Sequence, residues 1–213
     1  MRMQDNYVQS ESLVNVEIGL FSPTKACFPK GKWDELTHLN FDIDGDGKVC
    51  RVDSVRSVSN LLMKVMGKKG LWKSFFNKKK EEFDSIKQPG SSVNFLLVLK
   101  IKNSSDLFSQ IAFGMNPDEY VNAIGDSKGK VSDKFVELAK EVHSYISLLY
   151  GKESILVFRA VMDKSSPRFF VLVVPIEGDR VVPYKEMDLS KDGLKNTRTM
   201  MQNEISSIVA SYI

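Results

Sequence analysis

The chain has 213 residues, of which 42% are hydrophobic and 27% are charged, a balance typical of a globular protein. It contains only two histidines and two cysteines, which excludes a three-histidine metal cage and any zinc site built from three or four cysteines of one chain. The net charge of +3 is compatible with nucleic acid as a partner but does not require one.

The N-terminal half of the chain is dominated by strand patterns. Residues 1–12 are polar for the most part, and we expect them to be flexible. Alternating or continuous apolar side chains then predict strands, and helical spacing predicts one helix. The strands are expected at 13–20, 37–43, 48–52 and 93–101, and the helix at 54–66. The turn Gly45-Asp46 is suited to join the second and third of these strands as a hairpin.

The C-terminal half contains the longest helical pattern. Capping residues predict short helices after Asp106 and Asn116, and an apolar stripe predicts a helix over 131–149 that ends at Gly151. Two strands are expected at 155–162 and 169–175, followed by an amphipathic segment at 190–213. The apolar stripe of that segment either packs on the protein's own sheet or pairs with another helix, and the first interpretation is favoured.

These elements predict the fold class. Strands lie among helices without regular alternation, which favours an α+β fold with a mainly antiparallel sheet and helices packed on it. No repeat and no linker-like composition divides the chain, so we expect a single domain over residues 13–213.

Two stretches of the sequence carry a recognisable pattern. The first is residues 148–176, LLYGKESILVFRAVMDKSSPRFFVLVVPI, and the second is residues 37–43, THLNFDI. They resemble the Mob/Pre family of plasmid mobilisation relaxases. In that family a helix ends in Tyr-Gly-x-Glu-Asn-Ile, a strand leads into His-x-Asp-Glu-x-Thr-Pro-His-x-His, and the next strand reaches Val-Val-Pro. The residues in step are Tyr150, Gly151, Glu153, Ile155, Asp163, Pro167, Val173, Val174 and Pro175.

The second stretch is similar to the family's Ser-His-Leu-Asn-Tyr-Asp-Leu strand, with Phe41 in place of tyrosine. The resemblance implies a relaxase-like fold and DNA as the partner. It also implies that residues near the end of the 155–162 strand would form the site.

Departures from the family pattern concern the metal. Such relaxases hold a divalent ion with histidines and an acidic residue, whereas this chain has Val161, Lys164, Arg168 and Phe170 at the matching positions. Valine and phenylalanine offer no ligand atom, and the two cations would repel the ion. We therefore expect a pseudoenzyme without metal-dependent nicking, in which Lys164 and Arg168 bind phosphate directly. The alternative is a nuclease with relocated carboxylates, for instance Asp163 with Asp42 or Asp44.

A basic stretch rich in aromatic residues precedes these strands. Residues 61–80 contain many lysines and no acid, and Trp72 lies among them. Flexible cations suit phosphates and flat apolar rings suit unpaired bases, so the stretch favours DNA binding. The alternative is an amphipathic helix with its aromatic residues in the core. The residues assigned to DNA are Lys64, Lys68, Lys69, Trp72, Lys73, Lys78, Lys79 and Lys80, together with Lys164 and Arg168.

Residues 42–53, DIDGDGKVCRVD, match the loop of an EF-hand calcium site. Aspartates occupy its first, third and fifth positions and glycine the sixth, and an aspartate replaces the usual glutamate at the twelfth. The Ca²⁺ ligands would be Asp42, Asp44, Asp46, the Lys48 carbonyl and Asp53. The same residues also suit a plain hairpin turn, and a strand precedes the loop where an EF-hand has a helix.

The sequence thus predicts a DNA-binding protein that acts in the replication, mobilisation or recombination of a mobile element, with a recombinase or replication protein as a further partner. A calcium-binding interaction module is the second hypothesis. His38 and His143 are expected to be structural rather than catalytic. No apolar run approaches the ~20 residues that cross a bilayer, so no membrane partner is expected. Two cysteines without a metal spacing, and no signal peptide, predict a cytoplasmic protein.

Overall fold

The computed structural model describes residues 12–21, 36–52, 96–103, 106–125, 128–162, 166–174, 176–177, 180–181 and 191–213. The strands are β1 (Val14–Phe21), β2 (Phe41–Ile43), β3 (Val49–Arg51), β4 (Leu96–Asn103), β5 (Ile155–Val161), β6 (Arg168–Val173), β7 (Ile176–Glu177) and β8 (Arg180–Val181). The α-helices are α3 (Leu107–Phe113), α4 (Pro117–Ile124), α5 (Asp133–Tyr150) and α6 (Lys191–Ala210), and short 3₁₀ helices are η1 (Thr37–Leu39) and η2 (Lys152–Ser154).

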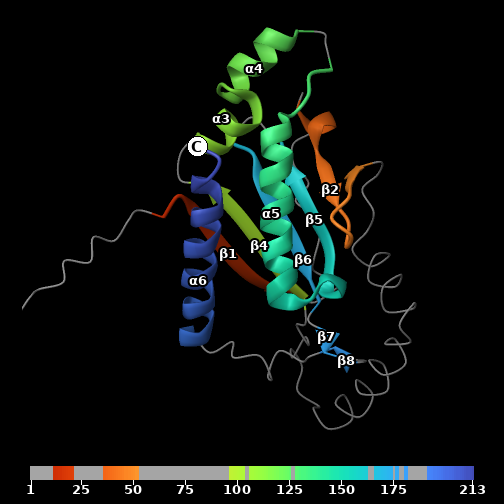
Figure 1. Cartoon of the computed structure of the whole chain (residues 1–213), viewed down its shortest axis with the longest axis vertical. Coiled ribbons are helices and arrows are strands. Elements are labelled where there is room, and N and C mark those ends of the chain that lie inside the picture. Colours follow the sequence, from red (N-terminus) through yellow and green to blue (C-terminus); the bar gives the residue numbers. More distant parts are fainter. Residues whose placement is uncertain are drawn as a thin grey trace, which may run out of the picture.

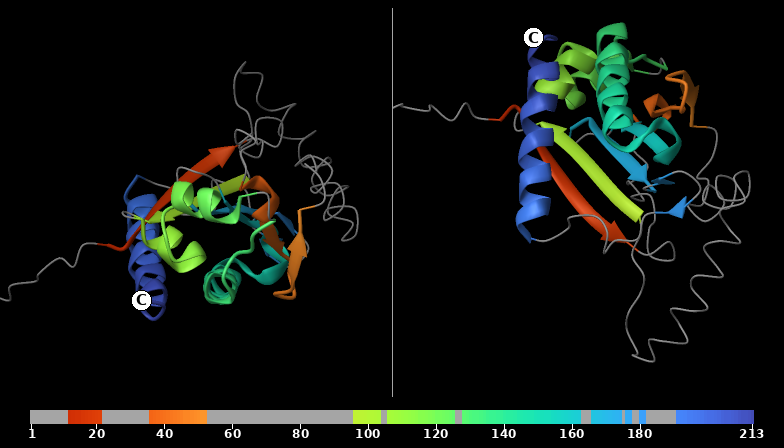
Figure 2. Two further views of the ribbon diagram at one scale, coloured as in Figure 1. Left: turned by 90° about the horizontal axis from the view of Figure 1, so that it is seen from above. Right: turned by 60° about the horizontal axis from the view of Figure 1, so that its bottom comes forward.

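Six of these strands form one sheet in the order β1-β4-β6-β5-β2-β3, and every neighbouring pair is antiparallel. Strands β7 and β8 form a separate two-stranded ribbon. Helices α3, α5 and α6 lie on one side of the sheet (Figures 1 and 2). The predicted α+β class, with a mainly antiparallel sheet and helices packed on it, is confirmed.

The core lies between the sheet and these helices. Phe169 of β6 is at its centre, with ring centroids 5.2 Å from Phe108, 5.3 Å from Phe135 and 5.4 Å from Phe158. All four rings are fully buried. Because large apolar side chains from two strands and two helices meet here, this aromatic cluster joins the sheet to the helical layer.

Helix α5 follows the predicted signals closely. The Ser132 hydroxyl accepts a hydrogen bond from the Phe135 amide at the N-terminus, and Gly151 ends the helix with a positive φ of 82°. Helix α6 packs against β1 and α5, and its residues Met201, Ile205 and Val209 are fully buried. The interpretation of the C-terminal stripe as part of the protein's own core is confirmed.

The predicted strand over residues 37–43 is partly wrong. Residues Thr37–Leu39 form the 3₁₀ helix η1, and only Phe41–Ile43 form β2. The turn buries Leu36 completely. Asn40 then places its side-chain oxygen 2.6 Å from the Met162 amide, beyond the last paired residue of β2. A side chain therefore satisfies the amide next to the ladder, and the strand need not extend further.

The hairpin expected at Gly45-Asp46 is confirmed, because β2 and β3 pair from Phe41 with Arg51 to Ile43 with Val49. The expected helix over 54–66 and the expected flexible N-terminus at 1–12 lie outside the described residues, apart from residue 12. Among the helices that the structure describes, none has the length and apolar character needed to span a membrane.

Candidate functional site

The face of the sheet opposite the helices carries a row of six residues, four of which are charged. The strand registers align one residue from each of the six strands along this row. In sheet order the row is Glu17, Lys100, Phe170, Arg159, Asp42 and Cys50. We call it the outer row. Residues paired across antiparallel strands share a face, so these side chains emerge on the same side.

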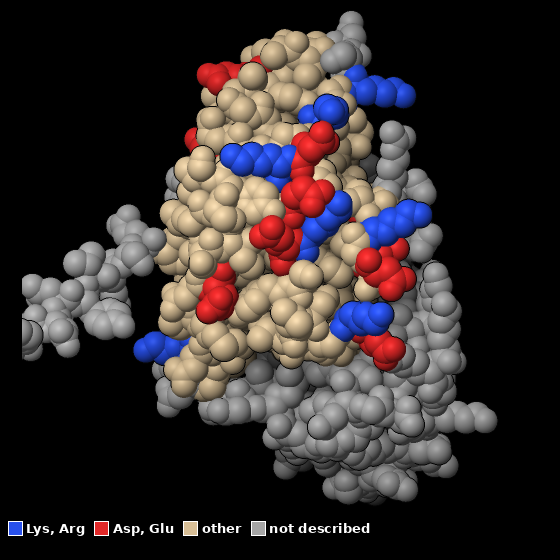
Figure 3. Space-filling view, in the orientation of Figure 1, with Lys and Arg blue, Asp and Glu red and all other residues tan. Residues whose placement is uncertain are grey.

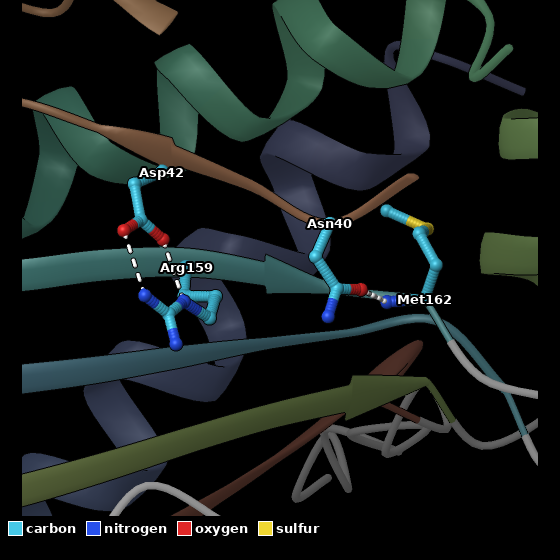
Figure 4. A network of polar contacts seen from close by, with 4 residues as sticks. All are labelled: Asn40, Asp42, Arg159 and Met162. Carbon is cyan, nitrogen blue, oxygen red and sulfur yellow. Dashed lines mark hydrogen bonds and ion pairs between the residues drawn. The ribbon is translucent and has the colours of Figure 1, made fainter. Parts of the chain in front are cut away.

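An ion pair between β2 and β5 is the best-defined feature of the outer row. The Arg159 Nε lies 2.7 Å from Asp42 Oδ1 and its second nitrogen, Nη2, lies 2.8 Å from Asp42 Oδ2. This is the bidentate geometry that arginine forms with carboxylates. Figure 4 shows both contacts between the two side chains. The Arg159 side chain is 10% exposed and that of Asp42 27% exposed, so the pair is largely shielded from water.

The other end of the outer row carries a second group of charges. The Glu17 carboxylate lies 2.9 Å from the Lys102 ammonium and 3.5 Å from that of Lys100. The hydrogen bond from Lys102 is the main reason that the pKa of Glu17 is lowered from its ordinary value of 4.5. All three side chains are more than 40% exposed. This part of the face is open to a charged ligand.

The resemblance matched Val161, Lys164, Arg168 and Phe170 to the family's metal-ligand positions. Three of these four residues lie on this face of the sheet. Val161 pairs directly with Arg168, and Phe170 lies between Lys100 and Arg159 in the outer row. Val161 is 8% and Phe170 2% exposed, although neither belongs to the core beneath the helices. The fourth position, Lys164, lies outside the described residues. Val161, Arg168 and Phe170 therefore lie on the same sheet face as Arg159.

Cations outnumber acids on the described part of this face. Lys100, Lys102, Arg159 and Arg168 are basic, whereas Glu17 and Asp42 are acidic. The residues assigned to DNA in the basic stretch lie outside the described residues, and so does Asp163. They are Lys64, Lys68, Lys69, Trp72, Lys73, Lys78, Lys79 and Lys80. Of the ten predicted DNA contacts, the structure therefore places Arg168 alone.

The described part of the calcium-like loop forms a hairpin turn. Asp44 Oδ1 accepts hydrogen bonds from the amides of Asp46 at 3.0 Å and Lys48 at 2.9 Å. Both carboxylate oxygens of Asp42 are held by Arg159. Within the described residues, no three His, Cys, Asp or Glu side chains form a group that could hold a metal ion. Asp53, the twelfth position of the loop, lies outside this part, so calcium binding stays a prediction.

The two histidines differ in their surroundings, because His38 is exposed and His143 is buried. The exposed His38 ring bonds through Nε2 to the Lys128 carbonyl oxygen. Because a carbonyl only accepts, this nitrogen carries a hydrogen and His38 has the hydrogen-bonded structural role expected of it. His143 is 4% exposed, and its ring meets the Phe158 ring edge-on. Burial lowers the pKa of His143 from its ordinary value of 6.5, and the negative charge of Asp44 partly offsets that effect.

Arg159 was not predicted from the sequence as a site residue. The sequence did contain a signal, because a strand whose other residues are all apolar, ILVFRAV, rarely carries a charged residue unless that residue is paired. The partner, Asp42, is 117 positions away in the sequence and was assigned to the calcium-like loop. Only the registry of β2 beside β5 brings the two together.

Comparisons with known proteins give two similar solved structures. One is the MobM relaxase domain (MOBV; Mob_Pre) bound to plasmid pMV158 oriT DNA, in a manganese-bound crystal at pH 5.5. It shares 12% identity over 91% of this chain and 86% of that chain, with a TM-score of 0.48. The other is the same domain with a 3′-thiophosphate DNA at pH 6.8, with 14% identity, coverages of 89% and 86%, and a TM-score of 0.44. No family profile and no curated protein matches the chain.

Proposed function

We propose that the protein binds DNA on a relaxase-like scaffold and does not nick it by a metal-dependent mechanism. The observation that carries this proposal is the Asp42–Arg159 pair beside Phe170 and Val161. On the sheet face where the resemblance would place metal ligands, the Arg159 guanidinium already neutralises the Asp42 carboxylate. A divalent ion at this point would face Arg159 at short range and find no free carboxylate oxygen on Asp42.

Phosphate is the ligand that this face suits instead. Arginine and lysine side chains donate charge-assisted hydrogen bonds to phosphate oxygens without a metal. Lys100 and Lys102 are half-exposed, and Arg168 lies across the sheet from Val161. The basic stretch at 61–80 would add further phosphate and base contacts. The proposed setting is the cytoplasm, in the replication, mobilisation or recombination of a mobile element, with a recombinase or replication protein as partner.

DNA binding is tested by fluorescence anisotropy with labelled single-stranded and duplex DNA over a salt series from about 50 to 200 mM. The logarithm of the affinity should fall linearly with the logarithm of the salt concentration, by ~0.9 per duplex phosphate contacted. The variant Lys100→Gln/Lys102→Gln/Arg168→Gln and the variant Lys78→Gln/Lys79→Gln/Lys80→Gln should each reduce this slope. The control is Lys140→Gln, because Lys140 lies on α5, on the side of the sheet opposite the outer row. Wild-type protein that shows no salt-dependent binding refutes the proposal.

The absence of nicking is tested separately. Pure protein is incubated with supercoiled plasmid and manganese, and the products are separated on a gel. We expect the plasmid to stay supercoiled. Nicked or relaxed product that disappears in Asp163→Asn or Asp42→Asn would instead support the relocated nuclease.

Calcium binding by residues 42–53 remains the second proposal. Three aspartates at alternate positions and the left-handed Gly47, with φ 79°, favour it. Arg159 disfavours calcium binding, because it already binds both carboxylate oxygens of Asp42 and would compete with the ion for them. Calorimetric titration should therefore detect calcium more strongly with Arg159→Gln than with the wild-type protein. No heat from either protein at millimolar calcium would exclude the loop as a calcium site.

A further inference from the structure

The end of the segment between α4 and α5, together with the first two residues of α5, exposes lysines at one end of the sheet. We call residues 128–134 the basic connector. It contains three exposed lysines, Lys128, Lys130 and Lys134, and one acidic residue, Asp133. It lies near η1 and the end of β5, at the top of Figure 1. Figure 3 shows two basic side chains at the upper right of this view, with acidic side chains directly below them and others over α4.

The backbone of the basic connector is held firmly. The Tyr120 hydroxyl accepts a hydrogen bond from the Lys130 amide and donates one to the Lys130 carbonyl, both at 2.7 Å. Gly129 has a positive φ of 53°, and a Cβ there would lie 2.7 Å from the Tyr120 oxygen. Ser132 donates from its hydroxyl to the Ile111 carbonyl at 2.6 Å. The lysines therefore extend from a backbone whose position is fixed before any ligand arrives.

Hydrogen bonds also join the basic connector to the site. His38 in η1 donates to the Lys128 carbonyl, and Asn40, just after η1, accepts from the Met162 amide at the end of β5. Val161, the residue before Met162, is one of the family-matched positions and pairs with Arg168. Strand pairing, chain neighbours and hydrogen bonds thus link Arg168 and Val161, through η1, to the Lys128 carbonyl.

We propose that the basic connector is a second phosphate-binding surface, which holds the nucleic-acid backbone as it leaves the outer face of the sheet. The inference rests on the proposed DNA binding and extends it to residues with no counterpart among the predicted contacts. The charge balance of the connector, three lysines against one aspartate, favours a polyanion. Its fixed backbone lowers the entropy lost when the lysines bind phosphates at set positions.

The test measures DNA affinity against salt for the variant Lys128→Gln/Lys130→Gln/Lys134→Gln. If all three lysines contact duplex phosphates, the slope of log affinity against log salt should fall by up to ~2.7, which is ~0.9 per contact. The matched control is Lys140→Gln/Lys195→Gln, which removes lysines from α5 and α6 and should leave the slope unchanged. Circular dichroism and thermal melting check that all variants fold.

A second variant tests the fixed backbone. His38→Ala keeps every lysine but removes the bond to the Lys128 carbonyl, so the affinity should fall several-fold while the slope stays near the wild-type value. If the wild-type protein binds DNA and the triple variant has the same slope of log affinity against log salt, the inference is overturned and the proposed function stays intact. Wild-type protein that binds no DNA overturns both. Binding of the wild type to anionic vesicles but not to DNA would assign the lysines to a membrane surface and also overturn the inference.

Discussion

Two neighbouring rows of the sheet are offset by one residue along the strands and differ in their charge. The row beneath the helices consists of Val16, Ile101, Phe169, Ala160 and Phe41, all at most 6% exposed. Each is adjacent in sequence to a member of the outer row, which is charged at four of its six positions. Side chains alternate between the faces of a strand, so the same strands serve both purposes.

The difference between the two rows indicates where sequence changes are tolerated. The inner row must fill a closely packed space, so its members are apolar and size-restricted. The outer row combines four charged residues with the buried Phe170, so its members are constrained by charge pairing and, at Phe170, also by packing. A one-residue slip in register would exchange the two rows and would bury four charges. The predictions below test how independent the two faces are.

The largest expected effect is at the inner row. Phe169→Ala should destabilise the protein by about 3–5 kcal/mol, because it removes a fully buried ring that contacts three others. Urea unfolding monitored by circular dichroism measures this loss. The control is Leu148→Ala on α5, whose side chain is 86% exposed and which should cost less than about 0.5 kcal/mol. Similar losses for the two variants would contradict the assigned core.

The next effect concerns the ion pair of the outer row. Arg159→Met should cost about 3 kcal/mol, because it leaves the Asp42 carboxylate largely shielded without its partner. The double variant Arg159→Met/Asp42→Leu should recover most of that stability, since no unpaired charge remains. Urea midpoints of the single and double variants give the comparison. A double variant as unstable as the single one would mean that the pair does not govern the stability of this face.

A smaller effect should depend on pH. The pKa of His143 is lowered in the folded protein by burial, so below pH 6.5 the unfolded chain takes up a proton that the folded ring resists. Stability should therefore decrease as the pH falls through 6.5, and His143→Gln should weaken this dependence. Thermal melting between pH 7.5 and 5.5 (about two units around that pKa) measures it. An identical pH profile for the variant would assign the acid sensitivity to other groups.

The smallest effect is at the exposed end of the outer row. Glu17→Gln should cost roughly 0.5 kcal/mol or less, because its lysine partners are exposed and solvent screens the pair. The lowered pKa of Glu17 means that this contribution is present above its ordinary pKa of 4.5 and is lost as the pH falls below it. Thermal melting of the wild type and the variant in low and high salt separates the ion-pair contribution of Glu17 from any packing contribution. A loss that persists in high salt would indicate a packing role for Glu17.

Local patterns predicted most of the elements but not their partners. The alternation over 13–20 and the caps of α5 depend on neighbouring residues, and both predictions are confirmed. The 3₁₀ turn at Thr37–Leu39 was missed because it is stabilised from outside, through Asn40, His38 and the burial of Leu36. The Asp42–Arg159 pair was missed for the same reason. Contacts between distant strands depend on register, which a single sequence does not reveal.

The packing of α6 against β1 has a consequence for how the chain folds. Ser12 beside β1 lies 3.0 Å from Ser206 of α6, hydroxyl oxygen to hydroxyl oxygen, across a separation of 194 residues. Met201, Ile205 and Val209 then complete the apolar layer over the first strand. During synthesis β1 therefore lacks the cover that α6 provides until residues 191–210 have left the ribosome. Long-range closure of this kind slows folding and favours chaperone assistance for the nascent protein.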